Sequence, residues 1–279
     1  MKQWLRSFYY SVPPSWRLAL RRMYYFPIDI IEGITGKRDS LTPPKGKIFT
    51  GSGDFIKQGK VFLQHFVKLG GLAPEHAVLD VGSGMGRMAV PLTKYLSSKG
   101  SYEGFDIMPD AVKWCNEHIS KEFPNFNFKC AALSNSLYTN AGEESASFSF
   151  PYPDGQFDFV FLTSVFTHMM PADVTQYLNE ISRVLKSNGK CFATFFYLDD
   201  QAIRFMADQE KPFFPYCLGS YFLHNLKVPE ANIGFTPEYI DTALLPTQLQ
   251  IVHIYPGWWS SRAKSDSVDF QDIIIFKKG

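Results

Sequence analysis

A glycine-rich run after a short apolar stretch is the clearest sign of ligand binding in this sequence. Residues 78–87 read VLDVGSGMGR, with glycines at Gly82, Gly84 and Gly86. Glycine lets a backbone approach a ligand closely, and a helix that starts there offers unpaired N–H groups to an anion or a polar group. The dinucleotide fingerprint G-x-G-x-x-G needs its third glycine at position 87, which is Arg87. The run therefore predicts a nucleotide-like ligand, while pyrophosphate binding loses support.

A carboxylate stands at the end of the next predicted strand. From this position, about twenty residues past such a glycine loop, the carboxylate of Asp106 can accept hydrogen bonds from both hydroxyls of a ribose. A turn or a helix cap is the alternative role for a single aspartate at a strand end. Its distance from the glycine run favours the ligand, so we interpret Asp106 as a ribose-binding residue.

The elements that must position these residues alternate between short strands and helices. Apolar periodicity predicts strands at residues 77–81, 101–106, 125–131, 157–163, 190–196, 249–255 and 269–276, and helices at 87–96, 109–121, 171–186 and 237–245. Such alternation is typical of a parallel sheet built from βαβ units. The predicted fold class is α/β, with a doubly wound, mostly parallel sheet.

Two segments fall outside this alternation. Residues 1–47 are basic, aromatic and punctuated by proline and glycine, with an amphipathic helix predicted at 15–25; a second helix is predicted at 55–69. Residues 198–235 are rich in aromatic side chains, which either shape an acceptor pocket or pack a cap onto the sheet. We therefore predict an N-terminal extension, residues 1–47, and a main domain, residues 48–279, with a cap inserted at residues 198–235.

The composition is that of a globular protein, with 45% hydrophobic and 20% charged residues among 279. The net charge of +1 gives no general reason to expect a nucleic-acid partner, although five basic residues precede the first acid, Asp29. No apolar run approaches the roughly 18 residues of a membrane span, and no signal-peptide core is found, so a cytoplasmic protein is expected. The four cysteines and six histidines show no metal-ligand spacing, so no metal site is predicted.

Taken together, these motifs resemble the class I S-adenosylmethionine-dependent methyltransferases. The match covers residues 75–197: Asp80 with the glycine run, then Asp106, then PDGQFDFV at 153–160, then LKSNGK at 185–190. The resemblance implies a seven-stranded sheet with a reversed final hairpin and S-adenosylmethionine as the cofactor. It also implies that the methionine part lies against the glycine run, and that Asp106 holds the ribose.

The remaining cofactor contacts follow from the same resemblance. The adenine would lie between Ile107 and Leu133. The acid that the family commonly carries after its third strand is missing, because residues 131–134 read AALS, so Ser134, Asn135 or a backbone carbonyl would receive the adenine amino group. The expected cofactor-binding residues are Asp80, Gly82, Ser83, Gly84, Gly86, Asp106, Ile107, Ala132, Leu133 and Thr163.

The stretch TSVFTH at residues 163–168 should border the transferred methyl group, because it follows the fourth strand of the sheet. Methyl transfer from a sulfonium is an in-line displacement in which charge is lost, so positioning and desolvation can supply most of the catalysis. His168 is the titratable group in this stretch that could take a proton from an acceptor hydroxyl or amine. A purely structural hydrogen bond is its alternative role.

Two roles are open for the basic and aromatic N-terminus. It can fold over the acceptor pocket as a lid, or lie on an anionic membrane surface. Pro13 and Pro14 should break it into short pieces, which favours the lid. Residues 49–55 are a second candidate lid, or contain a helix cap at Ser52 or Asp54.

The sequence thus predicts an S-adenosylmethionine-dependent methyltransferase that acts on an oxygen or nitrogen atom of a small molecule. The alternative is a non-catalytic protein of the same fold that binds the cofactor or serves as a scaffold. Aminopropyl transfer is disfavoured, because residues 163–168 contain no acid that could bind a polyamine.

Overall fold

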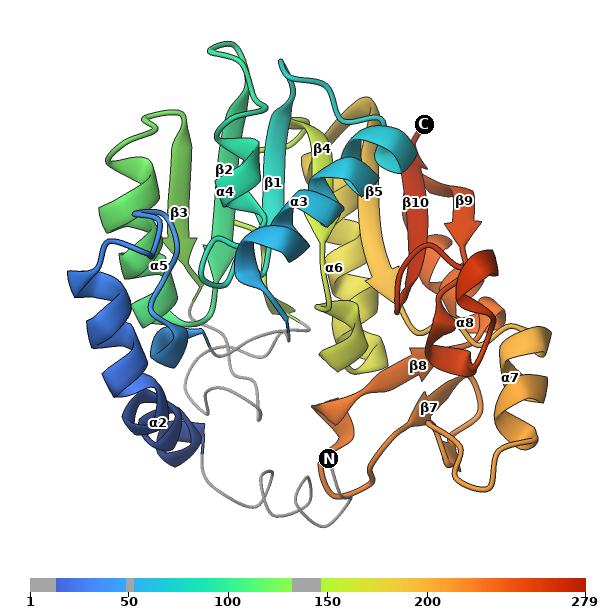
Figure 1. Cartoon of the computed structure of the whole chain (residues 1–279). Helices are drawn as coiled ribbons and strands as arrows, with labels where there is room; N and C mark the ends of the chain where they lie inside the picture. The colour runs from blue at the N-terminus through green and yellow to red at the C-terminus, as the bar shows by residue number, and fades with distance from the viewer. Residues whose placement is uncertain (1–13, 49–52, 132–146) are drawn as a thin grey trace.

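A seven-stranded sheet forms the centre of the molecule (Figure 1), in a computed structural model that describes residues 14–48, 53–131 and 147–279. The strand order is β3-β2-β1-β4-β5-β10-β9. Only β10 runs against the others, between β5 and β9. The strands are β1 (Ala77–Val81), β2 (Ser101–Asp106), β3 (Phe126–Cys130), β4 (Phe157–Leu162), β5 (Leu185–Phe195), β9 (Leu249–Tyr255) and β10 (Asp272–Lys278). The predicted α/β fold with a doubly wound, mostly parallel sheet is confirmed.

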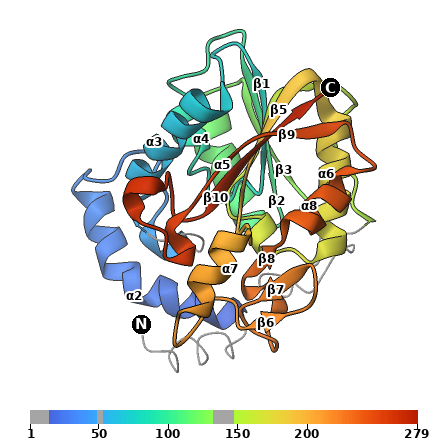
Figure 2. The ribbon, with the colours of Figure 1, turned by 90° about the vertical axis from the view of Figure 1, so that its right-hand side faces the viewer.

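Helices cover both faces of this sheet (Figure 2). One face is covered by α3 (Phe55–His65), α4 (Ala89–Leu92) and α5 (Pro109–Cys115), and the other by α6 (Pro171–Val184) and α8 (Pro237–Leu244). Successive strand residues point to opposite faces, so Val78 is buried on the α3 side and Leu79 on the α6 side. Because both faces are buried at the centre of the sheet, β1 and β4 are apolar almost throughout.

Several predicted boundaries agree with the structure, and β5 is the main exception. The bounds of β1, β2 and β9 are those predicted, but β5 begins at Leu185 rather than at residue 190. Phe157 pairs with Leu185 and Phe159 with Lys190, so the intervening residues of β5 bulge out of the ladder. Asn188-Gly189, a dipeptide that typically marks a turn, therefore lies inside a strand, and α6 ends two residues earlier than predicted.

The insertion after β5 has a small sheet of its own. It contains α7 (Asp200–Ala207) and the antiparallel strands β6 (Tyr216–Cys217), β7 (Tyr221–Leu223) and β8 (Ile233–Phe235). The ring of Phe214 lies 5.3 Å from that of Phe196 and 5.4 Å from that of Trp259, centroid to centroid. Aromatic contacts of this kind attach the insertion to the end of β5.

The N-terminal helix α2 (Pro14–Ile34) is longer than the predicted helix at residues 15–25. Pro14 is the first helical residue, where a missing N–H costs no helical hydrogen bond, so the helix begins at the predicted break; the expectation of short pieces is wrong for the described part, because α2 has 21 residues. The helix also continues through Pro27. It lies at the rim of the molecule (Figure 1), and Arg22 pairs with Asp110 of α5 at 2.8 Å. None of the helices described in the structure has the length and apolarity needed to cross a membrane.

Candidate functional site

A cavity of about 460 Å³ lies at the carboxyl ends of β1, β2 and β4. This volume is within the range of about 300–1,000 Å³ that is usual for small-molecule sites. Its walls come from the loops after these three strands, from α3 and α6, and from the segment that leads into β10. Open α/β sheets bind their ligands at this edge, so the cavity is the candidate functional site.

Glycines in the loop after β1 bring its backbone to the cavity wall. Gly82, Gly84 and Gly86 have φ angles of 81°, 52° and 78°, which glycine adopts without strain. A Cβ atom on Gly82 would lie 2.7 Å from Val165, and one on Gly86 would lie 2.6 Å from Ile119. At Gly82 and Gly86, glycine is therefore required both for the backbone conformation and for the close packing.

Asp106 connects this loop to the end of β2. Its Oδ2 accepts a hydrogen bond from the Gly84 N–H at 2.7 Å, and its Oδ1 accepts one from the Met108 N–H at 2.9 Å. Burial raises the pKa of Asp106, and these backbone hydrogen bonds partly oppose the rise. Each carboxylate oxygen can accept more than one hydrogen bond, so Asp106 retains acceptor capacity toward the cavity.

Asp80 is the second carboxyl group in the wall of the cavity. The Tyr102 hydroxyl donates to its Oδ2 at 2.5 Å, whereas Oδ1 is buried and has no hydrogen-bond partner among the described residues. Burial raises the pKa of Asp80 to about 8; the Tyr102 hydrogen bond opposes this rise, and the nearby charge of Asp106 adds to it. A buried polar atom without a partner is costly, so its presence in a cavity wall indicates a ligand that donates a hydrogen bond there.

The loop after β4 contributes Thr163 and His168 to the opposite wall. The Nδ1 atom of His168 lies 2.9 Å from the carbonyl oxygen of Glu230 in the insertion. A carbonyl oxygen only accepts, so Nδ1 carries the proton and Nε2 of the neutral ring keeps a lone pair. Burial lowers the pKa of His168, which favours that neutral ring at pH 7.

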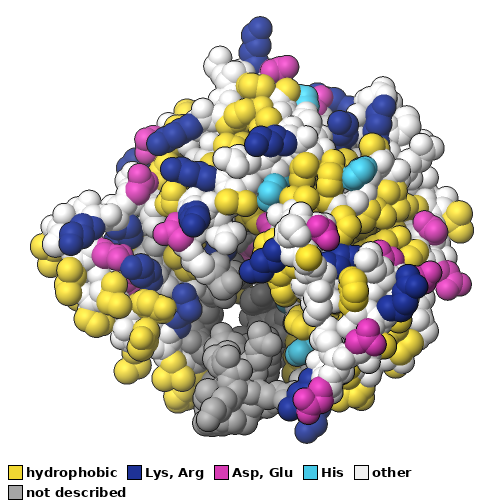
Figure 3. All heavy atoms as spheres, turned by 45° about the vertical axis from the view of Figure 1, so that its right-hand side comes forward, with side chains coloured by type: hydrophobic (Ala, Val, Ile, Leu, Met, Phe, Trp, Pro, Cys, Tyr) yellow, Lys and Arg dark blue, Asp and Glu magenta, His cyan; other side chains and the backbone are white. Residues whose placement is uncertain are grey.

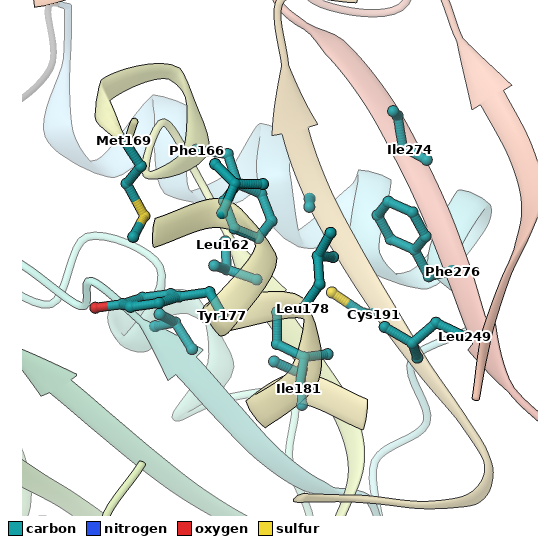
Figure 4. Close-up of a cluster of buried hydrophobic side chains, with 14 of the residues drawn as sticks. Leu162, Phe166, Met169, Tyr177, Leu178, Ile181, Cys191, Leu249, Ile274 and Phe276 are labelled. Carbon is teal, nitrogen blue, oxygen red and sulfur yellow. The ribbon is translucent and has the colours of Figure 1, made fainter. Parts of the chain in front are cut away.

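Apolar and aromatic side chains complete the cavity. Phe55 and Phe62 come from α3, Met169 from the loop after β4, and Phe270 from the segment before β10. The ring of Tyr177 packs in the core cluster under α6, and its hydroxyl points away from that cluster (Figure 4). Burial raises the pKa of Tyr177, so the hydroxyl in this wall is a hydrogen-bond donor. These walls favour a ligand with an apolar or flat part.

The structure brings together most of the residues that the sequence analysis selected. Gly86 lies in the same loop, but it packs against Cys115 and Ile119 and is not part of the cavity wall. Ala132 and Leu133, with Ser134 and Asn135, lie outside the described residues. The selected residues in the cavity wall are Asp80, Gly82, Ser83, Gly84, Asp106, Ile107, Thr163 and His168.

Sequence reasoning missed the residues that α3, α6 and the segment at 269–271 contribute. The sequence contains two signals near α3: the candidate lid at residues 49–55, of which Phe55 lines the cavity and residues 49–52 lie outside the described residues, and the helix cap. The cap is confirmed, because Asp54 accepts a hydrogen bond from the Lys57 N–H at 2.7 Å. Among the described residues, no part of 198–235 lines the cavity, so its role in shaping an acceptor pocket stays a prediction. Of residues 14–48, only Ile48 reaches the cavity. Within the ranges that the structure covers, no three His, Cys, Asp or Glu side chains gather as metal ligands would.

Comparison with known proteins independently supports the interpretation of this chain as a methyltransferase. Residues 79–193 match the methyltransferase domain family. An arsenite methyltransferase from Aquipseudomonas alcaligenes is 28% identical over 151 residues, which are 53% of this chain and 40% of that protein. A 2-phytyl-1,4-naphtoquinone methyltransferase from Nostoc is 23% identical over 185 residues, which are 66% of this chain and 70% of that protein. This chain therefore matches less than half of the arsenite enzyme.

A solved structure has the same fold. The PH0226 protein from Pyrococcus horikoshii superposes with a TM-score of 0.55 at 15% identity, covering 84% of this chain and 95% of that one. Its likeness concerns the fold alone, whereas the family match spans the glycine loop, Asp106 and the loop after β4. Residues 79–193 are therefore a methyltransferase domain, and the strand order and the site at the carboxyl edge of the sheet agree with its resemblance to the class I S-adenosylmethionine-dependent methyltransferases.

Proposed function

We propose that this protein transfers a methyl group from S-adenosylmethionine to an oxygen or nitrogen atom of a small-molecule acceptor. The observation that carries the proposal is the pair of buried carboxyl groups, Asp80 and Asp106, beside a glycine loop in one cavity. S-adenosylmethionine carries an ammonium group and two ribose hydroxyls, which are hydrogen-bond donors that suit carboxylate oxygens. When bound, it supplies a methyl group activated by its sulfonium.

The residues of the cavity fit this cofactor. Oδ1 of Asp80, unpartnered among the described residues, would receive the ammonium group, and the remaining acceptor capacity of Asp106 would receive the ribose hydroxyls. Ser83 adds a buried hydroxyl that has no partner in the described part of the chain. Ile107 borders the cavity two residues before the start of α5 and would contact the adenine. Ala132 and Leu133 remain the predicted second adenine contact.

His168 supports an acceptor that loses a proton when it is methylated. Its neutral ring has Nδ1 held by the Glu230 carbonyl, which leaves Nε2 to take a proton from a hydroxyl or an amine. Phe55, Phe62 and Phe270 would exclude water and hold an acceptor with an apolar or flat part. The named relatives act on arsenite and on a naphthoquinone, so the choice of oxygen or nitrogen depends on His168 and not on them.

Turnover is tested by incubating the full chain with S-adenosylmethionine and a panel of small hydroxyl and amine compounds. Formation of S-adenosylhomocysteine that depends on an added acceptor is the expected result. Tight binding of S-adenosylhomocysteine without turnover on any acceptor would instead favour the alternative, a non-catalytic protein of the same fold that binds the cofactor.

The cofactor assignment is tested by replacing the ribose acid. Asp106→Ala should weaken S-adenosylhomocysteine binding by about 1–3 kcal/mol in calorimetric titration, because the ribose hydroxyls lose a charged acceptor. Asp106→Asn keeps the shape of the side chain and should show the same direction of change. Asp208→Ala, at an exposed aspartate that ends α7, is the control and should leave the dissociation constant unchanged. Wild-type affinity in folded Asp106 variants would contradict the ribose role.

A further inference from the structure

The helix α2 presents its apolar side chains to solvent. Side chains at helical spacing along one face of α2 are between 54% and 81% exposed. Monomeric proteins rarely expose a contiguous apolar patch of this kind without a binding role. Figure 3 shows hydrophobic side chains gathered on the lobe at its left, which α2 forms. We call this set the α2 outer face: Trp16, Leu20, Met23, Tyr24, Phe26, Ile31 and Ile34.

The polar face of the same helix is turned toward the protein. Asp29 accepts hydrogen bonds from the N–H groups of Lys45 and Gly46 at 2.6 and 2.9 Å, and Glu32 pairs with the Lys45 ammonium group. Arg22 pairs with Asp110 of α5. A surface helix of a globular protein normally packs its apolar face inward. The reversed orientation of α2 leaves its outer face uncovered by the described residues, which indicates an apolar partner for this face.

The charge of this region specifies the chemistry of that partner. Residues 14–48 contain seven Lys and Arg against three Asp and Glu, whereas residues 49–279 contain 19 against 24. The two acids of α2 are engaged with Lys45 and with backbone N–H groups, while Arg22 and Lys37 are exposed. An isologous dimer through the outer face would bring two of these basic segments together, which opposes pairing with a second copy.

We propose that α2 docks on an anionic lipid bilayer, with the α2 outer face among the acyl chains and the exposed basic side chains of residues 14–48, such as Lys37, near the headgroups. An amphipathic helix with aromatic and aliphatic residues on one face and basic residues beside them binds this way, lying in the plane of the interface. Each basic residue near such a surface adds about 1 kcal/mol. At 1.5 Å per residue, the 21 residues of α2 extend about 31 Å along the bilayer.

Docking would also orient the rest of the molecule. Arg22 of α2 pairs with Asp110, and Asp110 lies only two residues after Met108, which lines the cavity. The contact therefore holds α2 close to the cavity. Figure 1 shows α2 at the end of the sheet where the parallel strands terminate. The end of the protein that contains the cavity would therefore face the bilayer. This inference about the surface does not depend on which acceptor is methylated.

The test compares two triple variants with the same change in charge. Leu20→Glu/Met23→Glu/Ile31→Glu alters the α2 outer face, and Leu218→Glu/Leu226→Glu/Leu245→Glu alters exposed apolar side chains elsewhere. Each full-length protein is sedimented with vesicles of equal parts phosphatidylcholine and phosphatidylglycerol, and with phosphatidylcholine vesicles. Binding of S-adenosylhomocysteine and the circular dichroism spectrum report the fold of both variants.

The wild type and the control variant should sediment with the phosphatidylglycerol vesicles at about 50 mM salt, and should be released at about 500 mM. The α2 variant should lose at least about tenfold in vesicle affinity, with its affinity for S-adenosylhomocysteine unchanged. The proposal is overturned if the wild type does not bind these vesicles, or if both variants lose binding equally. A dimer in sedimentation velocity that only the α2 variant dissociates, without vesicle binding by the wild type, would assign the face to a second copy instead.

Discussion

Asp80 is held in its protonated form at neutral pH because its carboxyl group is removed from water. Its pKa is about 8 in the folded chain, against 3.8 for an exposed aspartate, so the folded state keeps a proton that the unfolded chain releases. The contribution of Asp80 to the free energy of unfolding is thus fully present below pH 3.8 and is lost as the pH rises through 8. Asp80→Asn should flatten this part of the dependence of stability on pH.

The raised pKa of Asp80 also predicts that cofactor binding is coupled to the release of a proton. An ammonium group at Oδ1 favours the carboxylate, so binding of S-adenosylhomocysteine should release a proton and tighten as the pH rises from about 6 to about 8. Calorimetry in phosphate and in Tris, which differ in ionisation enthalpy, measures this proton directly. Asp80→Asn should bind with the same heat in both buffers. Equal heats for the wild type would show that Asp80 does not meet the ammonium group.

His168 gives a prediction about the rate rather than about affinity. His168→Ala should lower kcat by about 10²–10⁴-fold and leave the affinity for S-adenosylhomocysteine within a few fold, because only the proton acceptor is lost. In the wild type, kcat should fall on the acid side below the ordinary histidine pKa of 6.5, since burial lowers the pKa of His168. His253→Ala, at an exposed histidine of β9, is the control. If His168→Ala leaves kcat unchanged, the role of His168 is structural.

The part of the site that could be predicted from the sequence is the part that is local in the chain. Glycines followed by an acid at the next strand end select Gly82, Gly84 and Asp106 without knowledge of the fold. Phe62 and Phe270 are more than two hundred residues apart, and only the tertiary fold brings them to one cavity. No pattern of spacing connects them, so they could not be predicted.

Among the elements, the contact between α3 and α4 controls one wall of the cavity. A Cβ atom on Gly59 of α3 would lie 2.4 Å from the carbonyl oxygen of Arg87, so Gly59→Ala must push the two segments apart. Overpacking of this kind typically costs about 1–3 kcal/mol. Because α3 and Arg87 both line the cavity, we expect a lower melting temperature and weaker binding of S-adenosylhomocysteine.

Gly33→Ala is the matched control, since Gly33 also lies in a helix and its added Cβ would be 3.6 Å from the nearest atom, an ordinary contact. It should leave the melting temperature unchanged or raise it, because alanine is favoured over glycine in a helix. Equal stability of the two variants would show that α3 can move away from α4 without cost.

The elements differ in how far their sequences determined them. β1 and β2 are apolar runs that end at a glycine loop and at an acid, so both boundaries are marked. β5 contains a turn signal that the sheet accommodates as a bulge, because pairing with β4 resumes at Lys190. In α2 the prolines indicated short pieces, yet Pro14 occupies the first position of the helix, where proline is tolerated, and the helix continues for 21 residues. In β5 and α2, the position of a residue within the element, rather than its type alone, determined whether the element was interrupted.

At the scale of the whole molecule, we expect the N-terminal extension and the cofactor-binding cavity to be separable. Deletion of residues 1–26 should leave the affinity for S-adenosylhomocysteine within a few fold, because none of residues 14–26 lines the cavity. If the segment is also a lid over the acceptor, as the sequence analysis favoured, turnover on a soluble acceptor should fall. Calorimetry and the rate of S-adenosylhomocysteine formation measure the two effects separately. Loss of cofactor binding in the folded truncation would place the extension in the cofactor site.

The position of β10 has a consequence for how the chain is made. A ribosome delivers β9 before β10, yet the sheet order joins β9 to the other strands only through β10. While synthesis proceeds, β9 therefore emerges without its neighbour and must wait for residues 272–278. The segment at 269–271, which closes one wall of the cavity, arrives just before them. A nascent chain stalled before residue 269 should therefore lack a complete binding site. Cofactor binding by the nascent chain would then show that β10 has joined the sheet.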